Sequence, residues 1–197
     1  MELLSSASRS PINRGAITLL EAGLWIGLAL AIYAAAMGGG GNLFNRNDAS
    51  TEISNAADIL NNVSSMLKTE GTYQFSGADD MTGALVQFGG VPKGMTIIGK
   101  KESGSAKVQS LYGGAVTVQP VTTSGGQKSA FSLTYASLPQ EACIAIGTKV
   151  SASPRVGSTQ INGTTTNGPV PANSIGAMCN ADKGNVGQNT LTFVSNT

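Results

Sequence analysis

Residues 13–41 read NRGAITLLEAGLWIGLALAIYAAAMGGGG, and this stretch decides how the N-terminal part of the chain folds. Between Ile17 and Met37 the one charged residue is Glu21. A helix over these 21 residues is about 30 Å long, which matches the hydrocarbon core of a bilayer. The run therefore predicts a membrane-spanning helix. Because a lone carboxylate inside a membrane costs several kcal/mol, Glu21 requires a specific explanation.

The residues around the apolar run indicate its orientation. Arg9 and Arg14 stand against one acid, Glu2, in residues 1–16. The positive-inside rule therefore places the N-terminus in the cytoplasm and the rest of the chain outside. A cleavable signal peptide is the alternative interpretation, with Ala34–Ala36 as its cleavage site. Its apolar region would be shorter and free of charge, so the length of the run and its buried acid favour the membrane helix.

Four consecutive glycines follow the run: Gly38, Gly39, Gly40 and Gly41. Each costs about 1 kcal/mol relative to alanine inside a helix, so we expect a melted, glycine-rich joint over residues 38–47. An amphipathic second half of the helix is expected over residues 48–71, with Gly71 at its end. The apolar residues of this half repeat at three- and four-residue spacing on one face: Ile53, Ala56, Leu60, Val63 and Leu67.

Beyond residue 72 the apolar pattern changes to a period of two, which is typical of half-buried strands. The alternating segments are residues 116–118, 131–135 and 190–194. Two turn signals, Tyr112–Gly114 and Ser124–Gly126, flank the first of them. We therefore expect antiparallel strands at these positions and a globular head over residues 72–197.

Two further segments complete the predicted fold. Residues 142–150 fit either a short helix or a strand, and the preceding Pro139 favours a helix start. Residues 151–175 are rich in Gly, Pro, Ser, Thr and Asn, so we expect a long surface excursion there. The prediction is an α+β fold, in which one long N-terminal helix is laid on an antiparallel sheet and the two cysteines bound the C-terminal region.

Composition excludes several classes of function. The net charge is +1 and 12% of the residues are charged, with no basic cluster that could cover a nucleic-acid backbone. The chain has no histidine, which removes histidine triads and histidine metal sites. An enzyme tethered by the helix is disfavoured because the sequence has no GxSxG motif and no phosphate loop. We predict no enzyme activity and no cofactor.

A calcium site is the one metal site that the acidic residues suggest. Asp79, Asp80 and Asp182 carry the oxygen ligands that calcium prefers, but none of them lies in an EF-hand type of loop. We interpret all three as residues of solvated turns, and we predict no metal.

The two cysteines, Cys143 and Cys179, have no metal-ligand spacing. They are either two unrelated buried thiols or a disulfide. Because the preceding segments predict export to an oxidising compartment, we favour the disulfide. It would close a loop of 35 intervening residues and stabilise the fold by about 3–4 kcal/mol.

The order of features at the N-terminus is more specific than any one of them. The segment Gly15-Ala16-Ile17-Thr18-Leu19-Leu20-Glu21, followed by a long apolar run, resembles the start of the type IV pilins, and within them the type IVb class. Three further segments, Tyr112–Gly114, Phe131–Tyr135 and Leu138–Cys143, are similar to the strand-and-cysteine region of bundle-forming pilins and of the thin-pilus pilins of conjugative plasmids. The resemblance implies the type IV pilin fold.

The resemblance also implies that residues 1–16 are a leader that a prepilin peptidase removes. Leaders of the family usually end in glycine, with the acid five residues after the cut. A cut after Gly15 makes Glu21 the sixth residue, whereas a cut after Ala16 makes it the fifth. We therefore favour cleavage between Ala16 and Ile17. A sixteen-residue leader and a first residue other than phenylalanine also resemble the type IVb class.

An explanation for Glu21 follows from the same resemblance. In the family, this acid is thought to meet the free α-amine of a neighbouring subunit in the filament core. The implied register contact joins Glu21 to the new N-terminus at Ile17, next to Thr18. A paired carboxylate and ammonium recover much of their desolvation cost, and a subunit out of register would leave both unpaired. Since cleavage creates the amine, it must precede assembly.

The function implied by the resemblance is structural: the major subunit of a type IVb pilus, a helical filament of identical subunits. The expected partners are the prepilin peptidase, the inner-membrane assembly machinery and a tip adhesin. The expected location is the inner membrane before assembly and the bacterial surface afterwards, with residues 17–37 in the filament core. Resemblance to conjugative thin pilins favours mating-pair formation. The alternatives are a virulence adhesion pilus, a minor pilin and a pseudopilin of type II secretion.

Overall fold

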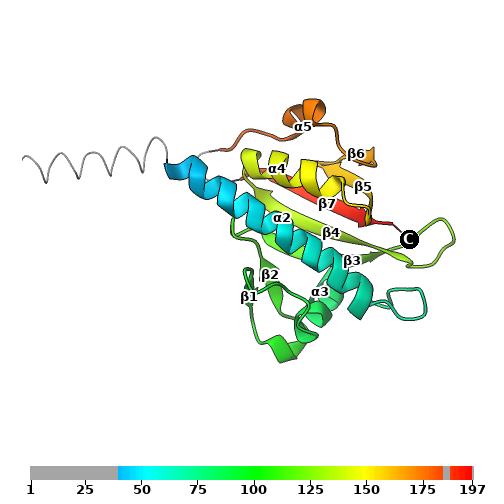
Figure 1. Cartoon of the computed structure of the whole chain (residues 1–197). Helices are drawn as coiled ribbons and strands as arrows, with labels where there is room; N and C mark the ends of the chain where they lie inside the picture. The colour runs from blue at the N-terminus through cyan, green and yellow to red at the C-terminus, as the bar shows by residue number, and fades with distance from the viewer. Residues whose placement is uncertain (1–39, 184–186, 197) are drawn as a thin grey trace, which may run out of the picture. The chain divides into compact units, whose positions relative to one another are not determined.

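The head of the protein is a long helix packed on an antiparallel sheet, as expected from the sequence (Figure 1). The computed structural model describes residues 40–183 and 187–196. The chain divides into two compact units, residues 1–44 and Asn45–Thr197. The second unit contains every strand named below. The predicted leader and the apolar run of residues 17–37 lie outside the described residues.

Four α-helices and one short 3-10 helix are described: α2 (Gly40–Met66), α3 (Ala78–Gln87), η1 (Lys101–Ser103), α4 (Gln140–Ser151) and α5 (Ala172–Met178). The strands are β1 (Thr96–Ile98), β2 (Lys107–Gln109), β3 (Ala115–Val121), β4 (Ala130–Leu138), β5 (Val156–Ile161), β6 (Thr164–Asn167) and β7 (Asn189–Ser195).

The strands form one seven-stranded sheet in the order β1-β2-β3-β4-β7-β5-β6, in which all neighbours are antiparallel. The last strand, β7, is inserted between β4 and β5, so the end of the chain forms a central strand. Its alternating residues Leu191 and Phe193 are fully buried, because one face of the sheet is covered by helices. Figure 1 shows α2 and α4 lying across that face.

The core of the head lies between α2 and the sheet. Five residues of the α2 segment and its end are at most 3% exposed: Ala56, Ile59, Leu60, Val63 and Leu67. They pack against a cluster that includes Phe131, Leu133 and Tyr135 of β4. The predicted apolar stripe is therefore confirmed, except that its first residue does not face the core fully. Ile53 is half-buried, whereas the neighbouring Glu52 is 0% exposed.

The ends of α2 differ from the predicted ends. The helix has no break between Gly40 and residue 47, although we expected a melted joint over 38–47; Gly38 and Gly39 lie outside the described residues. Extending an existing helix adds a hydrogen bond for each residue fixed, so a well-packed helix can carry glycines at its end. The helix ends at Met66, earlier than residue 71. Gly71, with a φ of 81°, instead lies in a turn between the bridged Thr69 and Thr72.

The predicted strands are confirmed at β3, β4 and β7, and residues 142–150 lie in α4. The long surface excursion over residues 151–175 is wrong, because this segment forms the β5–β6 hairpin and most of α5. The second strand of the hairpin, β6, is Thr-rich and lies at the edge of the sheet, where most of its side chains are exposed and no apolar alternation is left. We did not predict α3, β1 or β2, which are too short to show a clear apolar period.

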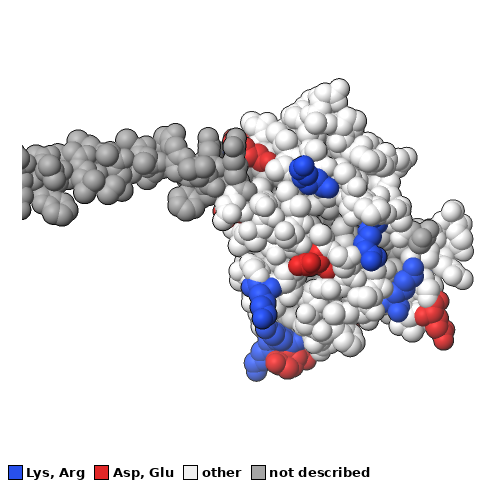
Figure 2. Space-filling view, in the orientation of Figure 1, with Lys and Arg blue, Asp and Glu red and all other residues white. Residues whose placement is uncertain are grey.

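Among the residues described, no helix has the length and apolar character that a membrane span requires. The face drawn in Figure 2 is covered mainly by uncharged residues. Lys and Arg side chains gather at the edge where Figure 1 draws β1, close in sequence to Lys100 and Lys101.

Candidate functional site

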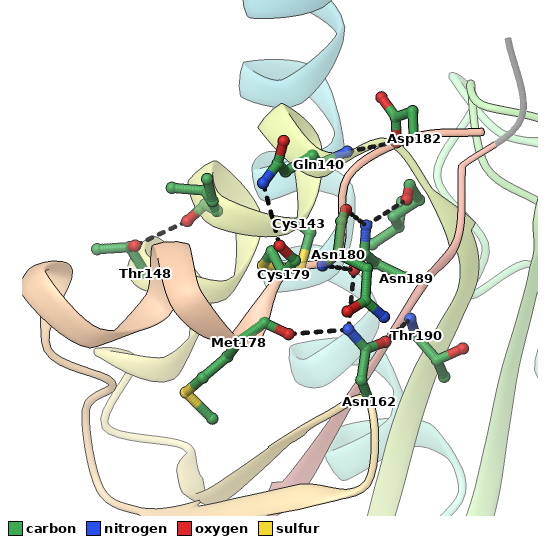
Figure 3. Close-up of a disulfide and its surroundings, with 12 residues drawn as sticks. Gln140, Cys143, Thr148, Asn162, Met178, Cys179, Asn180, Asp182, Asn189 and Thr190 are labelled. Atoms are coloured by element: carbon green, nitrogen blue, oxygen red, sulfur yellow. Dashed lines mark hydrogen bonds between the residues drawn. A yellow bond between two sulfur atoms is a disulfide. The ribbon is translucent and has the colours of Figure 1, made fainter. Parts of the chain in front are cut away.

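The disulfide of the C-terminal region is the predicted site that the structure describes most completely. Cys143 of α4 and Cys179, which directly follows α5, are joined with a Cα–Cα distance of 6.0 Å. Both side chains are buried, at 0% and 3% exposure. The bond therefore fixes α5 against α4, as Figure 3 shows, and the predicted pairing is confirmed.

Gln140 and Asp182 add two hydrogen bonds beside the disulfide (Figure 3). The Gln140 side-chain amide donates to the carbonyl of Cys179 at 3.1 Å. The Asp182 carboxylate accepts the backbone N–H of Gln140 at 2.9 Å, at the first residue of α4. Asp182 therefore satisfies an N–H group that the helix itself leaves unpaired, a role that we did not predict for this residue.

A buried asparagine completes the network around the disulfide. Asn189 of β7 is 0% exposed, and its amide donates to the carbonyls of Leu138 and Asn180 at 3.1 and 2.9 Å. Its carbonyl oxygen accepts the N–H of Asn180 at 2.6 Å and the side-chain amide of Asn162 at 2.8 Å. All hydrogen-bonding groups of this side chain are thus used, which joins β4, β7 and the segment after Cys179 into one rigid surface.

The second polar site joins α2 to the β2–β3 loop. The Glu52 carboxylate accepts the backbone N–H of Leu111 at 2.5 Å and the side-chain amide of Asn55 at 3.4 Å. The buried Tyr135 hydroxyl lies nearby, although within the described chain no partner meets hydrogen-bond geometry with it. Gly114 allows this loop to approach β4, because a Cβ there would collide with the carbonyl of Ala136.

Burial dominates the electrostatics of the Glu52 site. It raises the pKa of Glu52 above its ordinary value of 4.5, and the hydrogen bonds from Leu111 and Asn55 offset this shift in part. The nearby charge acting on Glu52 is that of Asp48, which has the same sign and raises the pKa further. Burial and the Glu52 carboxylate also raise the pKa of Tyr135. Because no cation in the described part of the chain acts on this buried acid, the contact between α2 and the loop is sensitive to pH.

The sequence did not predict Glu52 or Asn189 as site residues. Glu52 carries a weak signal, because it precedes Ala56 by four residues and so lies on the face of the apolar stripe. Asn189 carries none, since asparagine is common throughout this chain and its four bonds depend on tertiary contacts. Asp79 and Asp80 lie in the first turn of α3 and not in a turn between elements. Asp80 accepts the N–H and hydroxyl of Ser76 there.

The chemistry of these sites is structural. Within residues 40–183 and 187–196, no group of three or more His, Cys, Asp or Glu residues gathers to hold a metal ion. The residues predicted for leader cleavage and assembly, Gly15, Ala16, Ile17, Thr18 and Glu21, lie outside the described part of the chain. The disulfide, its amide network and the Glu52 contact each hold a surface segment in place, which suits a rigid head that contacts other proteins.

Comparison with known proteins gives consistent matches. A family model described as PilS N terminal matches residues 46–196. The crystal structure of a type IVb pilin from Salmonella typhi is 35% identical, covers 73% of this chain and 97% of its own, and has a TM-score of 0.65. The NMR structure of the type IVb pilin PilS from Salmonella typhi is 36% identical, covers 75% and 95%, and has a TM-score of 0.51. No curated protein sequence matches the chain significantly.

Proposed function

Because the chain belongs to the type IVb pilin family, whose members are the subunits of extracellular pili, we propose that it is the major subunit of such a pilus. The observation that carries the proposal is a conjunction of two features. Residues 46–196 have the fold of the family, and the apolar run of residues 17–37 with its acid, Glu21, precedes them directly. A major subunit needs both a rigid head for the filament surface and a long apolar helix for its core.

The proposed pathway begins in the inner membrane. A prepilin peptidase removes residues 1–16 by cutting between Ala16 and Ile17, and the assembly machinery of the inner membrane then adds the subunit to the filament. Glu21 pairs there with the α-amine of Ile17 of a neighbouring subunit. This pair offsets the cost of two buried charges and rejects subunits that are out of register. A tip adhesin is the last proposed partner.

The glycine run is proposed to act during this transfer. The helix is intact from Gly40 in the structure, and two of the four glycines, Gly40 and Gly41, form its first turn. Each glycine lowers helix stability by about 1 kcal/mol relative to alanine, so opening the helix at this turn costs the least free energy. We propose that it unwinds when the apolar run leaves the bilayer, which would let the head reorient against its neighbours.

We further propose that the filament acts in mating-pair formation during conjugation. The resemblance of Tyr112–Gly114 and Leu138–Cys143 to the thin-pilus pilins of conjugative plasmids supports this function. The cells to examine are donors that carry the gene and a deletion of it. Loss of mating in liquid, together with loss of filaments in electron micrographs, is the expected result, and normal mating by the deletion strain would overturn this function.

The test of the filament proposal is Glu21→Ala. Removing the charge makes membrane insertion easier by about 2–3 kcal/mol, so a simple anchor would be unharmed. A pilin should lose assembly, because the neighbour's α-amine is left buried and unpaired at a cost of about 3–5 kcal/mol per subunit. Mature monomer should accumulate in the membrane, and mixing in wild-type subunits should partly restore filament growth.

The measurements are the yield of sheared filaments, electron microscopy and a blot of the membrane fraction. Mass spectrometry of the mature protein reads the cleavage site and any methylation of the new N-terminus. Glu2→Ala is the matched control, because it removes an acid that the proposed cleavage discards, and it should leave the filaments unchanged. Normal filaments from Glu21→Ala cells would show that the register pair is wrong, and absence of wild-type chain from all filaments would overturn the pilin function.

A further inference from the structure

A polar cleft lies at the end of the head where three distant segments meet. Its walls come from the end of α2, from the turn before β5 and from the end of β7, and it encloses about 340 Å³. Tyr73 lines it, and we call it the Tyr73 cleft. The disulfide, its amide network and the Glu52 contact contribute no residue to its lining.

The walls of the Tyr73 cleft are held in place by hydrogen bonds. Asn196 at the end of β7 donates from its backbone N–H to the carbonyl of Arg155 and from its side-chain amide to the carbonyl of Pro154, both at 2.7 Å. The Tyr73 ring is 2% exposed and packs edge-to-face against Phe131, with ring centroids 5.3 Å apart. The ring and the turn that carries Arg155 are therefore pre-positioned before any ligand arrives.

Two cations converge on this cleft. The Lys68 ammonium lies 5.7 Å from the centroid of the Tyr73 ring, within cation–π range. Arg155, in the turn before β5, lines the same cleft as Tyr73 and supplies the second positive charge. Figure 2 shows positive side chains over the ends of α2 and β7, with a negative side chain beside the one nearer the end of α2.

Within the described residues, no acid lies within ion-pair distance of these cations. The side chains that line the Tyr73 cleft include no carboxylate, and neither Lys68 nor Arg155 forms an ion pair with a described acid. Ser195, which is 8% exposed, adds a nearly buried hydroxyl. Its oxygen accepts the N–H of Phe131 at 3.0 Å, so its hydrogen remains free to donate toward the cleft. The cleft thus offers positive charge and hydrogen-bond donors, and its lining contains no negatively charged group.

We propose that the Tyr73 cleft binds an acidic sugar, a monosaccharide unit that carries a carboxylate or a phosphate group. The planar Arg155 fork and the Lys68 charge suit the two or three oxygens of that group. Ser64, Ser195 and Asn196 supply hydroxyl and amide groups that match sugar hydroxyls. A volume near 340 Å³ is at the lower end of small-ligand sites, which fits a single sugar unit.

The experiment is saturation-transfer NMR on the full chain in neutral detergent, with glucuronate, glucose 6-phosphate and glucose as probes. Both acidic sugars should bind, and glucose should bind at least about tenfold more weakly because it offers no charge to the cations. Inorganic phosphate should compete with both acidic sugars. Binding of one acidic sugar and not the other would restrict the proposal to the carboxylate or to the phosphate class.

The matched variants are Arg155→Gln and Lys68→Gln, both at exposed side chains, with Lys149→Gln on α4 as the control for net charge. Each of the first two should lower the affinity for acidic sugars by about tenfold or more, and the control should leave it unchanged. Circular dichroism confirms that the variants are folded. Equal binding of glucose and glucuronate, unchanged binding in the Lys68 and Arg155 double variant, or no binding at about 10 mM would each overturn the proposal.

Discussion

Replacing Glu52 with glutamine tests the electrostatics of the contact between α2 and the β2–β3 loop. Glutamine keeps the shape of the side chain and an oxygen that can accept the N–H of Leu111, while it removes the ionisable group. Glu52 is 0% exposed, the neighbouring Asp48 adds charge of the same sign, and no cation of the described residues acts on the carboxylate. We therefore expect Glu52→Gln to stabilise the head at neutral and basic pH.

The sign of the pH dependence follows from the raised pKa of Glu52. In the unfolded chain this carboxyl titrates near its ordinary value of 4.5, and in the folded head it titrates higher. Between these two values the folded state binds more protons than the unfolded state, so the free energy of unfolding falls as pH rises. The slope is at most about 1.4 kcal/mol per pH unit. Below 4.5 both states are protonated, and wild type and Glu52→Gln should agree within about 1 kcal/mol.

The assay is urea unfolding at a series of pH values, followed by the near-ultraviolet circular dichroism of the tyrosines. Three of the four tyrosines, Tyr73, Tyr112 and Tyr135, lie in the head, whereas the single tryptophan, Trp25, lies in the apolar run. Glu70→Gln, which changes an exposed acid, is the matched control and should show no pH-dependent gain. If the gain of Glu52→Gln did not grow with pH, or if the variant became less stable than wild type as pH rose, the burial argument would be wrong.

Two further predictions concern packing and the disulfide. Changing Cys143 and Cys179 together to serine should lower the free energy of unfolding by about 3–4 kcal/mol in urea titrations, because the closed loop of 35 residues becomes free in the unfolded state; an unchanged midpoint would contradict this. Gly83→Ala in α3 should destabilise by about 1–3 kcal/mol, since its Cβ would collide with the carbonyl of Gly104. Gly176→Ala in α5, where the added Cβ meets open space, should instead stabilise by up to about 1 kcal/mol, and similar effects at both glycines would refute the close contact of α3 with the η1 loop.

Much of the fold was predictable because an element that buries one face has apolar residues at regular intervals in its sequence. The α2 stripe and the central strands β4 and β7 bury one face each, so their apolar residues follow periods of 3.6 and 2. The β5–β6 hairpin was not predicted, because β6 reads TTTN and lies at the edge of the sheet. A strand whose side chains are mostly exposed is specified by its backbone partners, and the sequence alone does not reveal them.

The cysteines and α3 also differ in whether the sequence reveals a contact or the contact depends on tertiary packing. The Cys143–Cys179 pair was predictable from the expected compartment and from the presence of just two cysteines. The approach of α3 to the η1 loop depends on Gly83, where a missing Cβ leaves room for the Gly104 carbonyl. From the sequence, this glycine is one of 26, and most glycines in such a chain read as turn residues.

Glu21 and Glu52 differ in how strongly the sequence alone suggests that each acid is buried. Glu21 interrupts a long apolar run, so any location of that run conflicts with its charge and a partner has to be postulated. Glu52 lies in a helix of mixed composition, where a rotation of one residue would place it in solvent and Ile53 in the core. The buried apolar stripe of α2 sets the rotation that the structure adopts. The Leu111 N–H, a backbone group 59 residues away, then donates to the Glu52 carboxylate and makes its burial tolerable. The sequence therefore suggests a buried acid where its neighbours in the chain are all apolar, as we predict for Glu21, and it gives little sign of one, such as Glu52, whose partner is a distant backbone group.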